Sequence, residues 1–114
     1  MAPARRRTRQ VSVDLHGYDV LTAVDLAEQR VRESWENGYD EVELLHGARD
    51  VRSGGDEGRG RIKTELLRML AAGRFDPYAD GNWPRAASLV LFLRPNPRPR
   101  RESWTPAPRR AYRR

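Results

Sequence analysis

The sequence contains no cysteine, which excludes a disulfide framework and any metal site built from thiolates. It also lacks a run of apolar residues long enough to cross a bilayer or to serve as the apolar part of a signal peptide. These absences predict a soluble, cytoplasmic protein without a membrane partner. The Arg-rich start could also suggest an organellar transit peptide, but it has no amphipathic apolar face.

Acidic residues are nearly absent from the two ends of the chain, so the formal net charge of +6 is unevenly distributed. Residues 1–10 contain four arginines and no acid, and residues 95–114 contain seven arginines and one glutamate. Residues 11–94 contain 11 basic and 15 acidic groups, a net charge of −4. We therefore expect a basic disordered arm over residues 1–10, one domain over residues 11–94 and a Pro/Arg-rich disordered tail over residues 95–114.

The arginines of the tail could bind a polyanion without reading its sequence, or they could simply keep the chain soluble. Five prolines interleave with them and disfavour helix, so an extended conformation is expected. Trp104 and Tyr112 favour nucleic acid as the partner, because aromatic rings among arginines can stack on unpaired bases.

The first part of the domain shows the pattern of a strand followed by a helix. Residues 11–15 are apolar at every second position, which is the period of a strand with one buried face. Apolar residues then recur every three to four positions, as on one face of a helix. Asp19 is placed to cap this helix, and Asn37-Gly38 to end it. The apolar face contains Val20, Ala23, Val24, Ala27, Val31 and Trp35.

The second part of the domain predicts two further strands and a helix. Strands are expected over residues 42–46 and 88–93, and a helix between them is expected to end at Gly73. Residues 74–87 are expected to form a loop, with room for a short strand near Phe75, because they include a glycine and two prolines. The apolar face of this helix contains Ile62, Leu66, Met69 and Leu70.

The element order is strand, helix, strand, helix, strand, which is typical of parallel strands joined by right-handed crossovers. The sequence therefore predicts the α/β class, as a two-layer α/β sandwich with a small, mostly parallel sheet. The carboxyl ends of the first two strands then lie at one edge of the sheet, where ligands of open α/β sheets usually bind.

The two histidines of the chain are each followed by glycine at the end of an expected strand. In Val13-Asp14-Leu15-His16-Gly17, the acid and the imidazole are two residues apart and share one face of the strand. Leu44-Leu45-His46-Gly47 repeats the apolar run and the His-Gly ending. Because neighbouring strand ends lie about 5 Å apart, His16 and His46 could face one phosphate between them.

Both motifs resemble those of the small MutS-related (Smr) domain family. Residues 13–17 are similar to the LDLHG motif that opens this domain, and His46-Gly47 is similar to the start of its HGxG or TGxG motif. Gly60-Arg61-Ile62 also matches in order and spacing, so the resemblance covers residues 11 to about 94. It implies an α/β sandwich and a nucleic-acid role, commonly endonuclease cleavage of RNA or nicking of DNA. Arg49 stands where the family has the second glycine of its second motif.

The resemblance and the chemistry together make Asp14, His16 and His46 the candidate catalytic residues. In the family, the acid and histidine of the first motif are tied to cleavage. Each also has a structural interpretation: Asp14 could cap the turn after its strand, and either imidazole could satisfy a backbone carbonyl. Gly17 and Gly47 are expected to allow a positive φ or a close backbone approach.

A basic stretch between the second strand and the second helix is a candidate nucleic-acid contact. Helix N-termini and successive backbone N–H groups attract phosphate, which would offset the unfavourable placement of cations there. The alternative is an ordinary mobile surface loop. The candidate nucleic-acid-binding residues are Arg49, Arg52, Arg59, Arg61 and Lys63, with Gly17 and Gly47 at the two turns.

Two cleavage chemistries fit these residues. In the preferred one, His16 and His46 act as general base and acid on RNA, the 2′-hydroxyl attacks the phosphate, and Arg49 or Arg52 stabilises the developing charge without a cofactor. In the other, Asp14 helps to hold Mg²⁺ or another divalent ion that activates water. A non-catalytic RNA- or DNA-binding module and a protein-interaction adaptor are the other functional classes. The sequence does not decide whether RNA or DNA is the nucleic acid that the protein binds, and it does not determine the oligomeric state.

Overall fold

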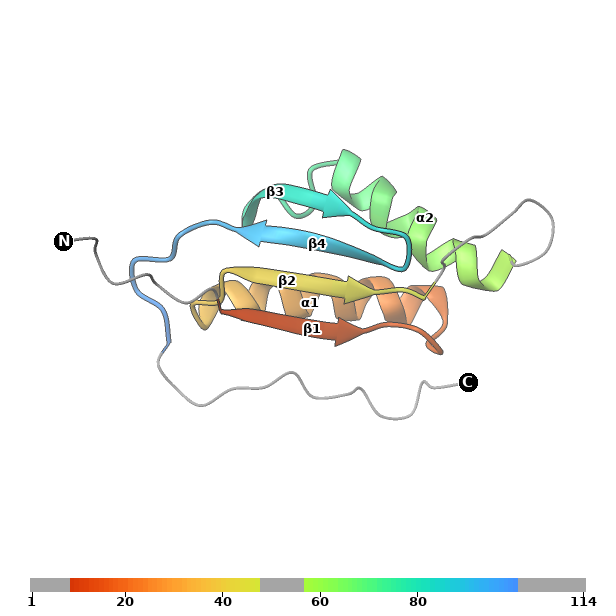
Figure 1. Ribbon diagram of the computed structural model, residues 1–114, viewed down its shortest axis with the longest axis horizontal. Coiled ribbons are helices and arrows are strands. Elements are labelled where there is room, and N and C mark those ends of the chain that lie inside the picture. Colours follow the sequence, from red (N-terminus) through yellow and green to blue (C-terminus); the bar gives the residue numbers. More distant parts are fainter. Residues whose placement is uncertain (1–8, 48–56, 101–114) are drawn as a thin grey trace.

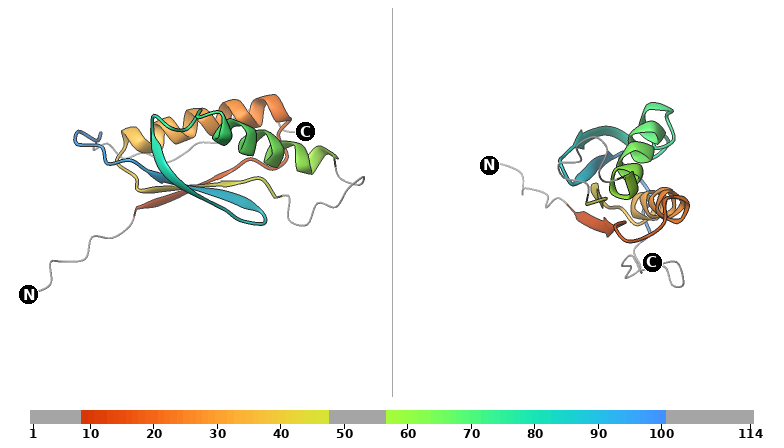
Figure 2. Two further views of the ribbon diagram at one scale, coloured as in Figure 1. Left: turned by 90° about the horizontal axis from the view of Figure 1, so that it is seen from above. Right: turned by 90° about the vertical axis from the view of Figure 1, so that its right-hand side faces the viewer.

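The computed structural model describes residues 9–47 and 57–100, with side chains described from Gly60 onward in the second segment. Two helices lie together on one face of a four-stranded sheet (Figures 1 and 2). The elements in chain order are β1 (Gln10–Asp14), α1 (Val20–Glu36), β2 (Glu41–Leu45), α2 (Glu57–Ala71), β3 (Ala79–Pro84) and β4 (Ser88–Leu93).

The sheet has the strand order β1-β2-β4-β3, and this corrects the expectation of a mostly parallel sheet. β1 and β2 are parallel, with Val13 opposite Leu44, whereas β4 is antiparallel to both β2 and β3. The element order also differs from strict strand-helix alternation, because two strands follow α2. The small α/β domain is therefore built on a mixed sheet in which antiparallel pairs predominate.

The reason for this error is β3, which occupies part of the segment expected to be a loop. Pro84 ends β3, and because β3 lies at the edge of the sheet, the missing N–H of a proline is tolerated there. The register shifts between Ala79 and Gly81, as at a β-bulge. α2 therefore connects β2 to β3, which run in the same direction, and β4 returns through a hairpin and inserts between them.

Local signals predicted the N-terminus of α1 and the C-terminal ends of both helices. The carboxylate of Asp19 accepts a hydrogen bond from the backbone N–H of Thr22 at 3.2 Å, which confirms it as the N-cap of α1. Gly38 follows the C-cap of α1 with φ +78°, and Gly73 follows α2 with φ +79°. α2 begins at Glu57, five residues before Ile62, the first residue of the expected apolar face, so part of the basic stretch before that face is already helical.

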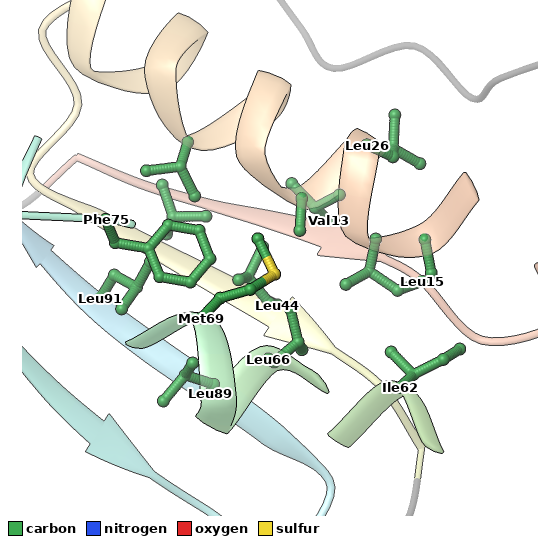
Figure 3. Packing of buried hydrophobic residues seen from close by; sticks show 14 of the residues in the cluster. Val13, Leu15, Leu26, Leu44, Ile62, Leu66, Met69, Phe75, Leu89 and Leu91 are labelled. Atoms are coloured by element: carbon green, nitrogen blue, oxygen red, sulfur yellow. The ribbon is translucent and has the colours of Figure 1, made fainter. Parts of the chain in front are cut away.

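The hydrophobic core lies between the two helices and the face of the sheet that they cover, called the helix-covered face. Figure 3 shows Leu66 and Met69 of α2 directed toward Leu44 of β2, with the ring of Phe75 beside Met69. Leu44, Leu66 and Phe75 are at most 1% exposed. Complete burial of such a side chain contributes about 1.5–3 kcal/mol, so this packing fixes the helices over the sheet.

The opposite face of the sheet carries no helix and is called the helix-free face (Figure 2). Strand register places Ser12, Glu43, Val90 and Trp83 side by side in one row across it. None of these four residues belongs to the core cluster. Val90 is nevertheless only 3% exposed, so the helix-free face combines polar and exposed aromatic side chains with a buried valine and carries no helical layer.

Part of the segment expected to be a tail packs against the end of α1. The side-chain amide of Asn96 donates to the carbonyl of Trp35 at 2.9 Å, and the N–H of Arg100 donates to the carbonyl of Glu36 at 2.8 Å. These bonds satisfy carbonyl groups that the last turn of a helix leaves without partners. Residues 1–8 and 101–114 lie outside the described residues. Neither described helix has the length and apolar content needed to cross a bilayer.

Candidate active site

The candidate residues gather at one end of the sheet, where β1 and β2 finish. The β3–β4 hairpin and the first turns of both helices lie at the same end (Figure 1). Leu15 N–H continues the parallel pairing beyond β1 by donating to the carbonyl of Leu45 at 2.8 Å. The N–H of Gly47 donates to the carbonyl of Ala87 at 3.0 Å, which ties the end of β2 to the hairpin.

Asp14 and His16 form a hydrogen-bonded pair at the end of β1. Oδ1 of Asp14 contacts Nδ1 of His16 and also accepts the backbone N–H of His16 at 3.1 Å. An ionised carboxylate can only accept, so Nδ1 of His16 is the donor in this contact, and the tautomer of a neutral imidazole that fits it leaves the lone pair on Nε2. The side chains of His16 and Asp14 are 63% and 50% exposed. The pair therefore offers an oriented imidazole base to a molecule in solution.

The local sequence explains why this pair faces outward. Leu15, between the two polar residues, is completely buried in the core, so its neighbours on either side point away from the core. Gly17 then takes φ +88°, a conformation that glycine adopts at little cost, and the chain turns toward α1. The buried leucine and the turn together hold Asp14 and His16 in place.

His46 occupies a different environment from His16. It is 3% exposed, and by strand alternation it lies on the side of Val42 and Leu44, which the helices cover. Burial lowers the pKa of His46 below its ordinary value of 6.5, and the positive charge of Lys63 lowers it further. A hydrogen bond with the backbone of Ser88 opposes both effects in part. These contacts favour a neutral imidazole inside the domain.

The structure therefore does not bring the two imidazoles to one phosphate. It brings Gly47 to His16 instead: a Cβ on Gly47 would lie 3.4 Å from Cβ of His16. Gly47 has φ +77°, so both motif glycines have the positive φ expected at turns. The two His-Gly turns are neighbours, but only the first exposes its ring.

The candidate phosphate-binding residues are described only in part. Arg61 is exposed on α2, and Lys63 is half-buried near His46. Arg49 and Arg52 lie outside the described residues, as does the side chain of Arg59. Arg61 and Lys63 place positive charge on the N-terminal half of α2, at the same end of the molecule as Asp14 and His16.

The described residues do not provide a ready set of metal ligands. No group of three or more histidine, aspartate or glutamate side chains suited to a metal occurs within residues 9–47 and 60–100. Oδ1 of Asp14 is already engaged by His16. A hard cation such as Mg²⁺ prefers about six oxygen ligands. The residues that the structure describes do not by themselves supply the oxygen ligands that the second chemistry needs, and we derive no step through a metal.

Sequence reasoning missed two exposed residues of the β3–β4 hairpin, Trp83 and Arg85. The guanidinium carbon of Arg85 lies 4.8 Å from the centroid of the Trp83 ring. Their spacing of two residues is the signal that could have found them, because it places both on one face of a strand. It was overlooked because the prolines of this segment predicted a loop.

No protein-family model matches the chain, and no curated protein or solved structure matches it either. The candidate function therefore depends on the geometry of this site and on the motifs of the sequence.

Proposed function

We propose that this protein is a cytoplasmic, Smr-like RNA-binding domain. In this proposal, residues at the end of β1 cleave a phosphodiester bond of the RNA. The observation that supports this best is the hydrogen bond between Asp14 and the exposed ring of His16. A carboxylate that orients an imidazole is a recurring arrangement for general acid-base catalysis. The resemblance of the two motifs to the Smr family supports the same function.

In the proposed reaction, Nε2 of His16 accepts the proton of an RNA 2′-hydroxyl. The 2′ oxygen forms a bond to the adjacent phosphorus, the bond from phosphorus to the 5′ oxygen breaks, and that oxygen takes a proton from solvent. Asp14 stabilises the imidazolium that forms and keeps the ring in the tautomer with a free Nε2. The products are a 2′,3′-cyclic phosphate and a 5′-hydroxyl.

Binding of the phosphate is assigned to the positive groups at the same end of the molecule. Arg61 and Lys63 lie on the N-terminal half of α2, where the helix dipole also favours an anion. Arg49 and Arg52, on the segment that follows Gly47, are the candidates for stabilising the charge on the transition state. Gly47 leaves space beside His16 for a close approach of the substrate.

A non-catalytic RNA- or DNA-binding module is the second candidate function. The burial of His46 favours it, because the second imidazole of the expected acid-base pair is not presented to a substrate. In such a module the same end of the sheet would bind phosphates without breaking a bond.

The test is an assay of the purified protein on labelled structured RNA, with and without a chelator. We expect cleavage in chelator that leaves a 2′,3′-cyclic phosphate. The matched control is the same RNA with a 2′-deoxy group at the scissile nucleotide, which should resist cleavage because the attacking hydroxyl is gone. Binding without cleavage would support the non-catalytic module. Cleavage of the 2′-deoxy substrate would contradict the proposed reaction.

A further inference from the structure

Trp83 is an exposed aromatic residue on the helix-free face. Its side chain is 54% exposed, although a tryptophan usually buries most of its large apolar surface. It lies on the edge strand β3, opposite Val90 of β4. Among the described residues it is the largest apolar side chain left exposed, beside Leu21 and Leu67. Such a ring is available for contact with a ligand.

Arg85 lies over this ring and is held there by Glu43. One terminal nitrogen of Arg85 donates to Oε2 of Glu43 at 3.3 Å, and the same oxygen accepts the hydroxyl of Ser88 at 2.6 Å. A guanidinium has five N–H donors, so this bond leaves others available. The Arg85 side chain is 49% exposed, whereas that of Glu43 is 16% exposed. Glu43 therefore orients Arg85, and the two charges balance.

Trp83 and Arg85 share the helix-free face with the proposed catalytic pair. Asp14 pairs with Leu45, Leu45 with Ser88, and the N–H of Arg85 donates to the carbonyl of Ser88 at 2.8 Å. These residues form one row, with Arg85 directly after the end of β3, so Asp14 and Arg85 are about 14 Å apart, or three interstrand spacings. Of the acids on this face of β1 and β2, Asp14 is paired with His16 and Glu43 with Arg85, and Glu41 lies at the other end of β2.

We propose that Trp83 and Arg85 form a stacking platform for an unpaired base of the RNA, so that the substrate is single-stranded next to the scissile bond. Indole rings and guanidinium planes both stack on exposed bases, and the remaining donors of Arg85 suit a phosphate. Bases inside a duplex are stacked on one another and do not reach such a platform. This inference rests on the proposed function and adds the class of substrate.

The experiment compares binding of a short single-stranded RNA with binding of the same sequence in a duplex, by fluorescence anisotropy. Trp83→Ala should weaken single-strand binding by about 5- to 100-fold, the range for loss of one stacked base, and change duplex binding less than about twofold. Trp83→Phe should retain most of the affinity, because a ring remains. Arg85→Lys keeps the charge but not the plane, so it should weaken single-strand binding more than duplex binding.

Leu21→Ala is the matched control, because Leu21 is an apolar side chain of α1 that is 78% exposed and lies outside the platform. It should leave both affinities unchanged. Thermal unfolding checks that each variant is folded. If Trp83→Ala is unfolded, Trp83→Phe and Arg85→Lys still test the platform. Equal losses on single strand and duplex would overturn the platform, as would parental single-strand binding by folded Trp83→Ala.

The result separates this inference from the proposed cleavage. If the protein binds single strands through Trp83 but leaves every RNA intact, the cleavage fails and the platform stands. If it cleaves RNA and Trp83→Ala changes neither affinity nor the choice of cleavage site, the platform is wrong and the cleavage stands.

Discussion

The two His-Gly turns, at the ends of the neighbouring parallel strands β1 and β2, differ in almost every physical respect. His16 follows Asp14 on the helix-free side, and its side chain is 63% exposed. His46 follows Leu44 on the helix-covered side and is 3% exposed. The same dipeptide at the same end of the sheet thus produces one surface imidazole and one buried imidazole.

The alternation of side chains along the strands, and not the His-Gly motif alone, therefore determines which histidine can meet a substrate. His16 is separated by one residue from a carboxylate, and that carboxylate orients its ring. His46 is separated by one residue from a core leucine, so its ring lies on the helix-covered side, where burial and the charge of Lys63 lower its pKa. The first turn is suited to acid-base chemistry, and the second to holding the end of β2 in place.

The largest expected effect is the loss of cleavage when the exposed pair is changed. His16→Ala and Asp14→Asn should each lower the single-turnover rate roughly a hundredfold or more, because general acid-base catalysis commonly contributes that much. Both side chains are at least half exposed, so the free energy of unfolding should change by no more than about 0.5 kcal/mol. His46→Gln is the control and should retain most of the cleavage rate. If the His16→Ala protein cleaved RNA as fast as the parent protein, the exposed imidazole would not be the one that reacts.

A smaller effect is expected when the turn glycines are changed. Gly17→Ala and Gly47→Ala should each lower the free energy of unfolding by about 1–2 kcal/mol, because φ is +88° and +77° at these positions. Only Gly47→Ala adds a methyl group 3.4 Å from Cβ of His16, so it should also slow cleavage at temperatures where the protein is folded. Urea unfolding and cleavage rates together measure both effects. Parental stability of both variants would show that the turns adjust without strain.

The smallest effect is a pH dependence of stability that belongs to His46. The folded-state pKa of His46 is below 6.5, so between that pKa and 6.5 the unfolded chain binds a proton that the folded chain does not. His46 therefore costs no stability above pH 6.5, and stability falls as the pH drops toward the folded pKa. The slope from one such group is at most about 1.4 kcal/mol per pH unit.

His46→Gln should remove this part of the pH dependence, whereas His16→Gln is the matched control. Urea unfolding of the parent and both variants between pH 7 and pH 5 measures the three slopes. The parent should lose stability faster than His46→Gln as the pH falls. Identical slopes for the parent and His46→Gln would show that the buried imidazole does not titrate differently from one in the unfolded chain.

Part of the fold could be predicted because it depends on neighbours in the sequence. Alternating apolar residues predicted β1 and β2, and the cap at Asp19 and the glycines after both helices placed the helix ends. The antiparallel β4 could not be predicted in this way. Its position depends on β3, an edge strand whose glycine and terminal proline are typical of loops as well.

By itself, the sequence determined the contact between Asp14 and His16, because the two residues are only two apart and Oδ1 of Asp14 also accepts the backbone N–H of His16 in the turn that ends β1. Only the tertiary structure decided that His46 is buried, because the groups that act on its ring, Lys63 of α2 and the backbone of Ser88 of β4, come from further along the chain. The tertiary structure also decided the meeting of Glu43 with Arg85, 42 residues apart, since it required β4 to insert between β2 and β3. Contacts of this second kind depend on the order of strands in the sheet, and the hydrophobic period of a single strand does not specify that order.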